Sequence, residues 1–457
     1  MGGKTPSALL AVGPGRYRPD HPLPLPDFEM TTSPLSLTAV YEAAPQPGPA
    51  TDDGTARFLA LTARAYAAVD EVPARIEEGV AALAERLGFH ADTNATATAI
   101  LISVSKGERQ WTQVIRLQLG APDYKGSVAL HRILVRVLRG EITPDDAADR
   151  LTTLLEYQQR PSGWLIVLAS ALLSASAGLL LHAELNELAI AIGLGAVVGA
   201  VLWSLRNRPH LAPLAPVALA SLASAVAFGA ERLGGGDVRP MPMLVASLVI
   251  LLPGWRLTVA MTELAQGHWT AGSGRFMAAI TTLLLLIVGV VVGQQAVESR
   301  HSATLVMPSL TSLPTWIRVL SPLAAGLSMT ILFNARRRDA VWITVICIVT
   351  SFAAYLAGLY LGSTASAFVG AFTAMAAGTL LARWLRLPYP VLQQPATVLL
   401  VPGAIGFMSM GSLVSRNVDA AVQTGFQMLF VALTLSIGAM AAQVALRPIT
   451  ARIFDDD

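Results

Sequence analysis

The chain has 457 residues, of which 53% are hydrophobic and 14% are charged. These proportions depart from the average for soluble proteins and indicate a membrane protein. The net charge of +2 gives no reason to expect a nucleic-acid partner, and the single cysteine, Cys347, excludes a disulfide framework and a cysteine-based metal site. We therefore expect neither a metal nor another cofactor.

Polar and apolar residues are separated along the chain. Residues 1–160 are polar and residues 161–457 are mostly apolar, which predicts a soluble head followed by a membrane unit. Near the N-terminus, no basic segment followed by an apolar stretch resembles a signal peptide. The head is therefore expected to stay in the cytoplasm.

The head begins with residues 1–54, whose Pro- and Gly-rich composition predicts a flexible leader. Residues 55–160 are expected to form a small cytoplasmic α+β domain. Periodicity predicts helices over 57–69, 74–88, 127–140 and 143–159, and strands over 89–95, 98–106 and 110–118. Gly88 is expected to end the second helix, and Thr143 to cap the last one, with Pro144 at its first position.

Four polar residues lie together in the first of these strands: His90, Asp92, Thr93 and Asn94. A ligand or catalytic role is conceivable for such a cluster. Strand alternation, however, places His90, Asp92 and Asn94 on one face, which favours an ordinary solvated surface. The remaining histidines are scattered and the chain has no Walker-type glycine loop, so we expect no enzyme and no ATP-driven pump.

Ten apolar segments follow the head, each near the roughly twenty residues that a helix needs to cross a bilayer. They run approximately over 164–182, 188–205, 212–230, 242–266, 275–296, 315–333, 340–361, 363–382, 395–414 and 423–446. The expected fold is an α-helical polytopic membrane protein with ten transmembrane helices.

The ten segments form two similar sets of five, residues 161–297 and 314–447. Pro253-Gly254 in the fourth segment matches Pro402-Gly403 in the ninth, and Gly289 in the fifth matches Gly438 in the tenth. Because each set has an odd number of spans, the second must enter the membrane from the opposite side. Many secondary transporters have such inverted repeats, with the binding site between them where helices are interrupted.

Loop charges predict the orientation. Arginine is concentrated in the loops expected on the cytoplasmic side, which are the stretches 206–210, around 275, 334–339, 383–390 and the tail beyond 446. The loops at 183–187 and 231–240 are expected outside. The positive-inside rule then places both termini in the cytoplasm.

The fourth segment contains a break that an ordinary membrane helix lacks. Entering from outside near Met241, the chain reaches Pro253 after about eleven residues, roughly half of a 30 Å hydrocarbon core. Backbone groups freed by a break are tolerated only beside protein or a water-filled cavity. We therefore assign Pro253-Gly254 and Pro402-Gly403 as helix breaks, although simple kinks remain an alternative.

Polar residues follow the first break, and we assign Arg256, Thr258, Thr262 and Glu263 to a substrate and proton pathway. Arg256 lies near the N-terminus of the half-helix and Glu263 lies near its C-terminus. The helix dipole disfavours a cation at the first position and an anion at the second. Arg256 is suited to a substrate carboxylate, and Glu263 to a substrate ammonium group or a coupling proton. Alternatively, Glu263 is solvated at the cytoplasmic boundary, or Arg256 extends toward that boundary.

These motifs together resemble the bacterial threonine/serine exporters over residues 55–446. The resemblance rests on the head stretch ARIEEGVAALAERLGFHADTNATATAILISV, on LLPG…EL…G…GRF in the fourth segment and on LVPG in the ninth. Glu263 falls where the family usually has an acidic residue, and Gly254, Pro402 and Gly403 fall on its glycine and proline positions. Arg256 departs from the pattern, since an uncharged residue is expected there.

The resemblance implies export of L-threonine and L-serine driven by the proton gradient, so the expected partners are a small amino acid, protons and the lipid bilayer. Some relatives with the two parts on separate chains are similar to dicarboxylate exporters, which makes a succinate-type substrate the alternative. An alternative of another class is a membrane sensor or regulatory protein. Substrate, coupling ion, the role of the head and formation of a homo-oligomer stay open at this stage.

Overall fold

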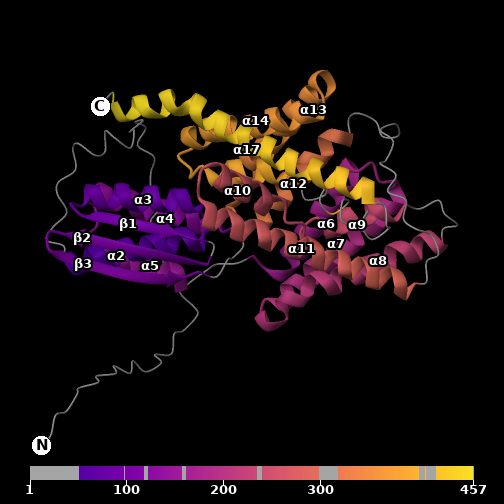
Figure 1. The fold of residues 1–457 in the computed structure, drawn as a ribbon, viewed down its shortest axis with the longest axis horizontal. Coiled ribbons are helices and arrows are strands. Elements are labelled where there is room, and N and C mark those ends of the chain that lie inside the picture. The colour runs from indigo at the N-terminus through magenta and orange to yellow at the C-terminus, as the bar shows by residue number, and fades with distance from the viewer. Residues whose placement is uncertain are drawn as a thin grey trace, which may run out of the picture.

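The computed structural model describes residues 51–96, 98–117, 122–156, 161–233, 239–297, 317–400, 407 and 418–455. Most of the expected leader and the second expected break, Pro402-Gly403, lie outside these ranges. The head lies at one end of the molecule, and the helical unit extends away from it (Figure 1).

The described part of the head contains four helices and three strands, as predicted. The helices are α2 (Asp52–Ala68), α3 (Pro73–Arg86), α4 (Tyr124–Leu138) and α5 (Pro144–Glu156), and the strands are β1 (His90–Ala95), β2 (Ala99–Lys106) and β3 (Arg109–Arg116). Gly88 has a φ of 75°, as expected at a helix end. Asp146 N donates to Thr143 Oγ1 at 3.2 Å, which confirms the predicted cap of α5.

Helix α2 begins at Asp52, inside the stretch predicted as leader. The side chain of Thr51 accepts a hydrogen bond from Gly54 N at 3.0 Å, and Asp52 and Asp53 occupy the first turn. A capping hydroxyl and acidic residues at this end stabilise a helix. The polar residues at the end of the predicted leader therefore form the N-cap and first turn of α2.

The three strands form an antiparallel sheet in the order β1-β2-β3. Ile100, Ile102 and Val104 alternate along β2 and lie in the core of the head with Phe58 and Leu59 of α2. On β1 the residues His90, Asp92 and Asn94 are exposed, as the alternation predicts. Burial of one sheet face therefore sets the register of the strands.

Among the described residues, seven helices are long and apolar enough to cross a membrane. They are α6 (Gly163–Leu180), α7 (Leu185–Leu205), α8 (Ala215–Leu233), α11 (Trp269–Ala296), α13 (Ala340–Leu361), α14 (Ser363–Trp384) and α17 (Val418–Asp455). The other expected segments contain shorter helices, which are α9 (Pro240–Leu248), α10 (Gly254–Ala265), α12 (Ile317–Leu332) and α15 (Pro390–Val398).

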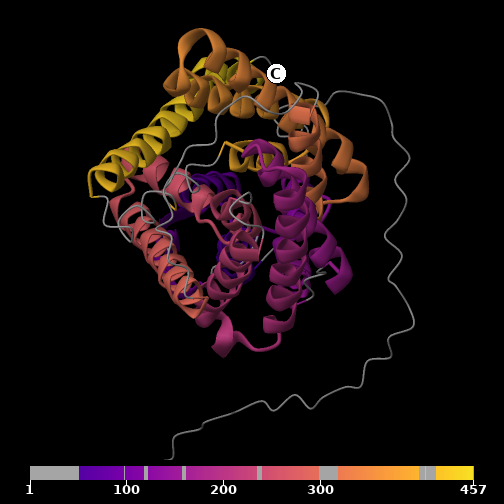
Figure 2. The ribbon, with the colours of Figure 1, turned by 90° about the vertical axis from the view of Figure 1, so that its right-hand side faces the viewer.

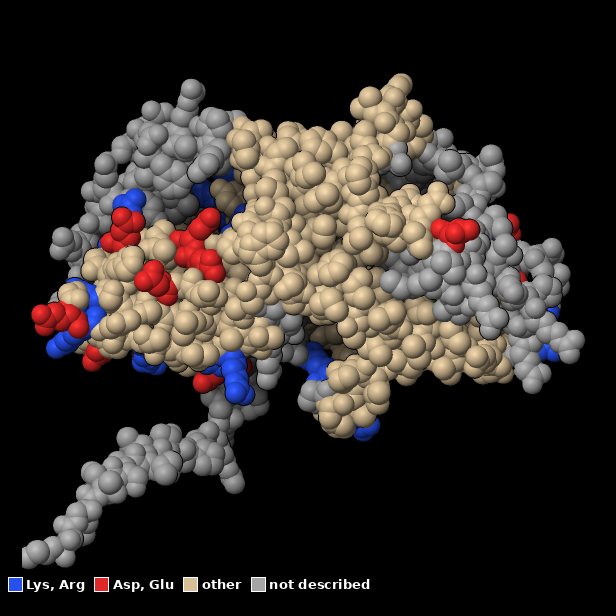
Figure 3. Space-filling model, in the orientation of Figure 1, with Lys and Arg blue, Asp and Glu red and all other residues tan. Residues whose placement is uncertain are grey.

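The surface of the helical unit is mostly uncharged, whereas Lys, Arg, Asp and Glu gather on the head (Figure 3). Large apolar side chains on the long helices are exposed, including Phe352, Leu359 and Phe430. Apolar surface on this scale is stable beside lipid and unfavourable in water. The chain is therefore a multi-pass membrane protein with a polar head.

The fourth expected segment is divided in two. Helix α9 ends at Leu248, helix α10 begins at Gly254, and Pro253 occupies the N-cap position of α10. The chain thus leaves helical geometry at the position where the sequence places the first break. Proline supplies no N–H at this point, so the break leaves one backbone donor fewer to satisfy.

The residues of α6 to α11 and those of α12 to α17 lie on opposite sides of the unit (Figure 2). Packing partners correspond between the two sides: α7 packs on α6 and α11 on α8, while α13 packs on α12 and α17 on α14. Gly289 brings α11 against the backbone of α8, and Gly438 brings α17 against the backbone of α14. Two matching glycines therefore serve the same close approach.

Helices α6 and α12 pack against each other at the boundary between the two sides and run in opposite directions. Ser176 Oγ donates to Ser321 O at 2.8 Å and Ser321 Oγ donates to Ser176 O at 3.0 Å. Further along, Ser328 Oγ donates to Ala169 O at 2.7 Å. The residue numbers of the partners rise along α12 as they fall along α6, so the two helices are antiparallel.

We expect Gly289→Ala to destabilise the protein. An added Cβ would clash with the Val217 carbonyl oxygen of α8, which cannot move without shifting the helix. Overpacking of this kind costs about 1–3 kcal/mol and exceeds the helix-propensity gain of roughly 1 kcal/mol. Thermal unfolding in detergent measures the effect. Gly193→Ala on α7 is the control, because its Cβ would meet no atom within 4 Å; equal melting temperatures for the two variants would contradict the packing argument.

Candidate functional site

A polar cluster lies where the head meets α10 and α11. A turn at Gly267, with a φ of 88°, connects the two helices, and His268 N donates to Glu263 O at 2.9 Å across it. His268 Nδ1 lies 3.9 Å from Glu77 Oε2 of α3 in the head. The turn therefore touches the head, and the C-terminal half of α10 faces it.

Glu263 forms a buried ion pair at this junction. Its Oε1 lies 3.1 Å from Arg275 Nε of α11, and the two side chains are 3% and 9% exposed. Among the described residues, neither Glu263 oxygen nor Arg275 Nε makes a hydrogen bond of standard geometry. A buried ion pair with unused hydrogen-bonding capacity is costly for stability, which makes this pair a candidate for a functional role.

Arg256 lies on the same helix as Glu263 but in a different environment. It occupies the first turn of α10, is exposed, and forms no ion pair of 4.0 Å or less with a described residue. Its charge nevertheless acts on the carboxyl of Asp70 in the head, as does that of Arg275. Arg256 is thus an unpaired cation beside the cluster.

Thr258 and Thr262 use their hydroxyls within α10. Thr258 Oγ1 donates to Gly254 O at 3.2 Å, and Thr262 Oγ1 donates to Thr258 O at 2.9 Å. Ser436 of α17 also donates to Thr258 O, at 3.2 Å. These bonds tie α10 to itself and to α17, so the two threonines have no hydroxyl proton left to offer a ligand in this arrangement.

The second half of the unit contributes α15. Gln393, Gln394 and Thr397 are buried on this short helix. Gln393 Nε2 donates to Thr379 Oγ1 at 2.8 Å, and Gln394 Oε1 accepts from Tyr124 Oη of the head at 3.1 Å. Gln394 Nε2 has no hydrogen bond of standard geometry among the described residues. Another buried polar group at the junction is therefore left with free capacity.

The head contributes Asp70, which follows α2. Burial raises the pKa of the Asp70 carboxyl to about 6, against the opposing charges of Arg275 and Arg256. The Gln394 amide also lowers this pKa, so it lies near the carboxyl, although the two make no hydrogen bond of standard geometry. The cluster therefore joins α10, α11, α15 and the head.

Three of these residues were missed by the sequence reasoning: Asp70, Tyr124 and Gln394. The apolar segment predicted from residue 395 excluded Gln394, whereas α15 begins at Pro390. Arg275 was predicted as a loop charge, which is wrong, because it lies inside α11 and is buried. A hydropathy pattern excludes a charged residue from an apolar helix. Arg275 is nevertheless buried in α11 because Glu263 neutralises its charge. Gly403 and Pro402 lie outside the described residues.

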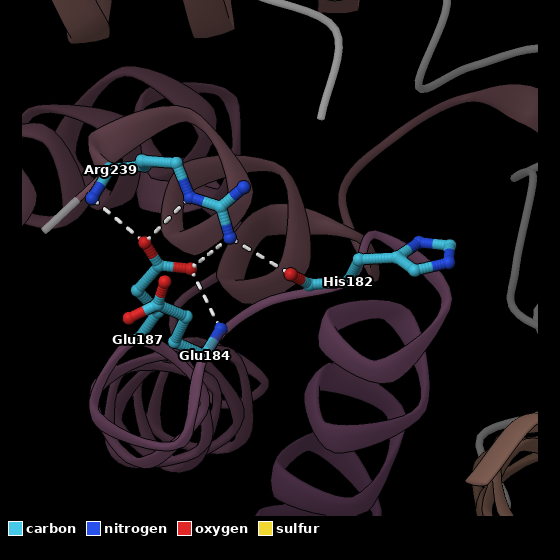
Figure 4. Close-up of polar contacts among 4 residues, drawn as sticks. All are labelled: His182, Glu184, Glu187 and Arg239. Atoms are coloured by element: carbon cyan, nitrogen blue, oxygen red, sulfur yellow. Dashed lines mark hydrogen bonds and ion pairs between the residues drawn. The ribbon is translucent and has the colours of Figure 1, made fainter. Parts of the chain in front are cut away.

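A second ion pair anchors the opposite end of the broken segment (Figure 4). Arg239 N and Nε donate to Glu187 Oε1 at 2.8 and 3.0 Å, and Arg239 Nη2 donates to Glu187 Oε2 at 2.9 Å. Nη2 also donates to His182 O at 2.8 Å, and Glu184 N donates to Glu187 Oε2 at 2.9 Å. The start of α9 is thereby fixed to the α6–α7 turn.

We expect Glu187→Gln to lower the free energy of unfolding by about 1–3 kcal/mol, because an amide cannot accept from all of these donors. Arg239 is 40% exposed, so water compensates part of the loss. The control is Glu78→Gln, which removes an exposed carboxylate of the head, far from this network in the chain. Chemical or thermal unfolding that does not separate the two variants would contradict the anchoring role.

Two family models match the chain. One, described as "Putative threonine/serine exporter", matches residues 57–297, and the other, "Threonine/Serine exporter, ThrE", matches residues 319–445. The first begins in the head and ends with α11, and the second extends from α12 into α17. The two matches together span most of the chain.

The chain is also similar to the pheromone-regulated membrane protein 10 of two Candida albicans strains, with 24% identity over 347 residues. The match covers 70% of this chain and 31% of each relative, so the chain spans about a third of their length. No solved structure matches. From the family matches and the multi-pass architecture, we conclude that the chain belongs to the threonine/serine exporter family.

Proposed function

We propose that the protein is a secondary active exporter of L-threonine and L-serine, driven by the proton gradient. Family membership supports a membrane exporter of small molecules. The observation that carries the proposal is the cluster around Glu263 and Arg275, a buried ion pair with unused hydrogen-bonding capacity. A zwitterionic amino acid needs both signs of charge in a partly desolvated site, and this cluster supplies both.

Within this proposal Glu263 carries the coupling proton. A buried carboxylate exchanges a proton when its partner or its exposure changes. In the described state Arg275 neutralises Glu263 at 3.1 Å. Protonation of Glu263 would leave the charge of Arg275 uncompensated and lower the negative charge that attracts a substrate ammonium group. Proton binding and amino-acid binding would then oppose each other, as export in exchange for an entering proton requires.

We also propose two inverted five-helix repeats, with both termini in the cytoplasm of a bacterium. Helices α8, α9 and α11 begin at residues 215, 240 and 269, and α14, α15 and α17 begin at residues 363, 390 and 418. This nearly constant spacing, the matching glycine contacts and the antiparallel pairing of α6 with α12 support the repeats. On this topology, the short helices α9, α10 and α15 belong to interrupted spans next to the transport site.

A dicarboxylate is the second candidate substrate. Arg256 and Arg275 are two cations close enough to act on the same carboxyl group, that of Asp70. Two guanidinium groups could bind the two carboxylates of succinate in place of one zwitterion. A negative charge of the protein beside these cations would favour an amino acid, whereas two cations alone would favour a dicarboxylate.

Efflux from proteoliposomes tests the proposal. Vesicles loaded with labelled threonine, serine or succinate are given an imposed proton gradient, and release is compared with release without a gradient and from protein-free vesicles. Gradient-dependent release of threonine or serine supports the proposal. Release of succinate alone would assign the protein to dicarboxylates, and release of none of the three would contradict export and favour a sensor.

A further inference from the structure

Asp70 lies at a position where the helix dipole does not favour a negative charge. It follows the C-terminus of α2 with a φ of 61°, a left-handed conformation that an uncharged asparagine or glycine adopts as readily as an aspartate. Its carboxylate also lies near the negative end of the α2 dipole, where a cation would be stabilising. Local folding therefore gives no reason for a negative charge at residue 70.

The head is held against the helical unit by contacts of α3 and of the start of α4. Tyr124 N donates to Phe333 O at 3.0 Å, and Asn334 Nδ2 donates to Asp123 Oδ1 at 2.8 Å. The Arg75 guanidinium lies over the Tyr389 ring, 5.4 Å from its centroid. Tyr124 and Val128 of α4 also belong to a core shared with α13, α14 and α15.

The docked head leaves one anion and one cation of the cluster without an ion-pair partner. Glu263 and Arg275 neutralise each other at 3.1 Å, whereas neither Asp70 nor Arg256 has an ion pair of 4.0 Å or less among the described residues. Asp70 and Arg256 nevertheless interact electrostatically. A zwitterionic group carries the two charges that would neutralise both.

An unsatisfied amide lies on the same side. Gln394 is 3% exposed, its Oε1 is held by Tyr124, and its Nε2 faces the Asp70 carboxyl without a standard hydrogen bond. A buried donor left open in this way is costly unless a ligand or water satisfies it. Together with the Glu263 oxygens and Arg275 Nε, it leaves several buried polar atoms at the junction that a polar ligand would satisfy.

We propose that Asp70 of the head binds the α-ammonium group of the transported amino acid, while Arg256 of α10 binds its carboxylate. The site is then a composite of head and membrane unit, and Glu263 stays free for the proton. The inference rests on the proposed export of amino acids and adds the residue that selects an amino acid over a dicarboxylate. A second substrate carboxylate would meet the like charge of Asp70 and be repelled.

The charge of Asp70 adds a pH dependence to this proposal. The groups that face its carboxyl are Arg256 of α10, Arg275 of α11, Glu263 of α10, Gln394 of α15, Tyr124 of α4 and the neighbouring Glu71. Because its pKa is raised to about 6, Asp70 is mainly ionised at pH 7 and becomes protonated below pH 6. An ammonium group binds the ionised form, so the KM for threonine on the head side should rise as the pH falls through about 6.

The test compares Asp70→Asn with the wild type in proteoliposomes, using threonine and 3-hydroxybutyrate, which lacks the ammonium group. Asparagine is isosteric and tolerates the left-handed backbone, so folding should be kept. We expect the KM for threonine to rise about 10- to 100-fold, the pH dependence near 6 to disappear, and 3-hydroxybutyrate flux to stay unchanged or increase. Glu78→Gln, which removes an exposed charge of the head, is the control.

Two results would overturn the inference. One is an Asp70→Asn variant with wild-type KM for threonine, and the other is an equal loss of threonine and 3-hydroxybutyrate flux, which would indicate a structural role. The wild type separates this inference from the proposed function. If the wild type releases no threonine, the proposed function fails; if it does and Asp70→Asn behaves identically, only the role of Asp70 fails.

Discussion

Glu263→Gln is expected to abolish proton-driven threonine efflux while threonine–threonine exchange continues. Glutamine cannot take up and release a proton, but it keeps the length and polarity of the side chain. Exchange of labelled for unlabelled threonine needs substrate binding and reorientation without net proton movement. We therefore expect net efflux to fall at least about 100-fold, the size of a lost proton-transfer step, with exchange reduced only a few-fold.

Stability has to be separated from coupling in this experiment. Removing one partner of a buried ion pair leaves an uncompensated charge and costs about 3–5 kcal/mol. The double variant Glu263→Gln with Arg275→Gln removes both charges and should recover most of the melting temperature without recovering efflux. Gradient-driven efflux at the wild-type rate in Glu263→Gln would exclude this residue as the proton carrier.

The fold of the head could be predicted from local signals. Helices α3 and α5 are amphipathic, and the start of α5 carries Thr143 and Pro144, which act within four residues of sequence. The alternation of β1 likewise predicts which of its residues are exposed. Each of these features is decided by neighbours in the chain, so no tertiary information was needed.

The site could be predicted only in part, because its members come from distant positions. The break at Pro253 and the charges of Arg256 and Glu263 stand out in an apolar segment, and the sequence points to them directly. Asp70 and Gln394 are ordinary surface residues by sequence and meet only through the docking of the head on α15. The pairing of Glu187 with Arg239 had a visible signal, since both lie in loops expected on the same side of the membrane.

Replacing Arg256 is the second substitution with a large expected effect. Arg256→Ala removes the unpaired cation of the cluster, and a charge-assisted bidentate contact is worth about 2–3 kcal/mol. We therefore expect kcat/KM for threonine to fall about 30- to 150-fold. Arg256→Lys keeps the charge without the planar fork, so it should recover only part of the loss.

Comparing the threonine and serine fluxes of two arginine variants tests whether Arg256 binds the substrate carboxylate. If the group takes the amino-acid carboxylate, threonine and serine fluxes fall together in Arg256→Ala, whereas melting temperature changes little because the side chain is exposed. Arg208→Ala, an exposed arginine away from the cluster, serves as the matched control and should leave both fluxes unchanged. Equal fluxes in Arg256→Ala and Arg208→Ala would mean that Arg256 does not contact substrate. In that case Arg275 would be the remaining cation of the cluster able to hold the carboxylate, and Glu263 would have to release it first.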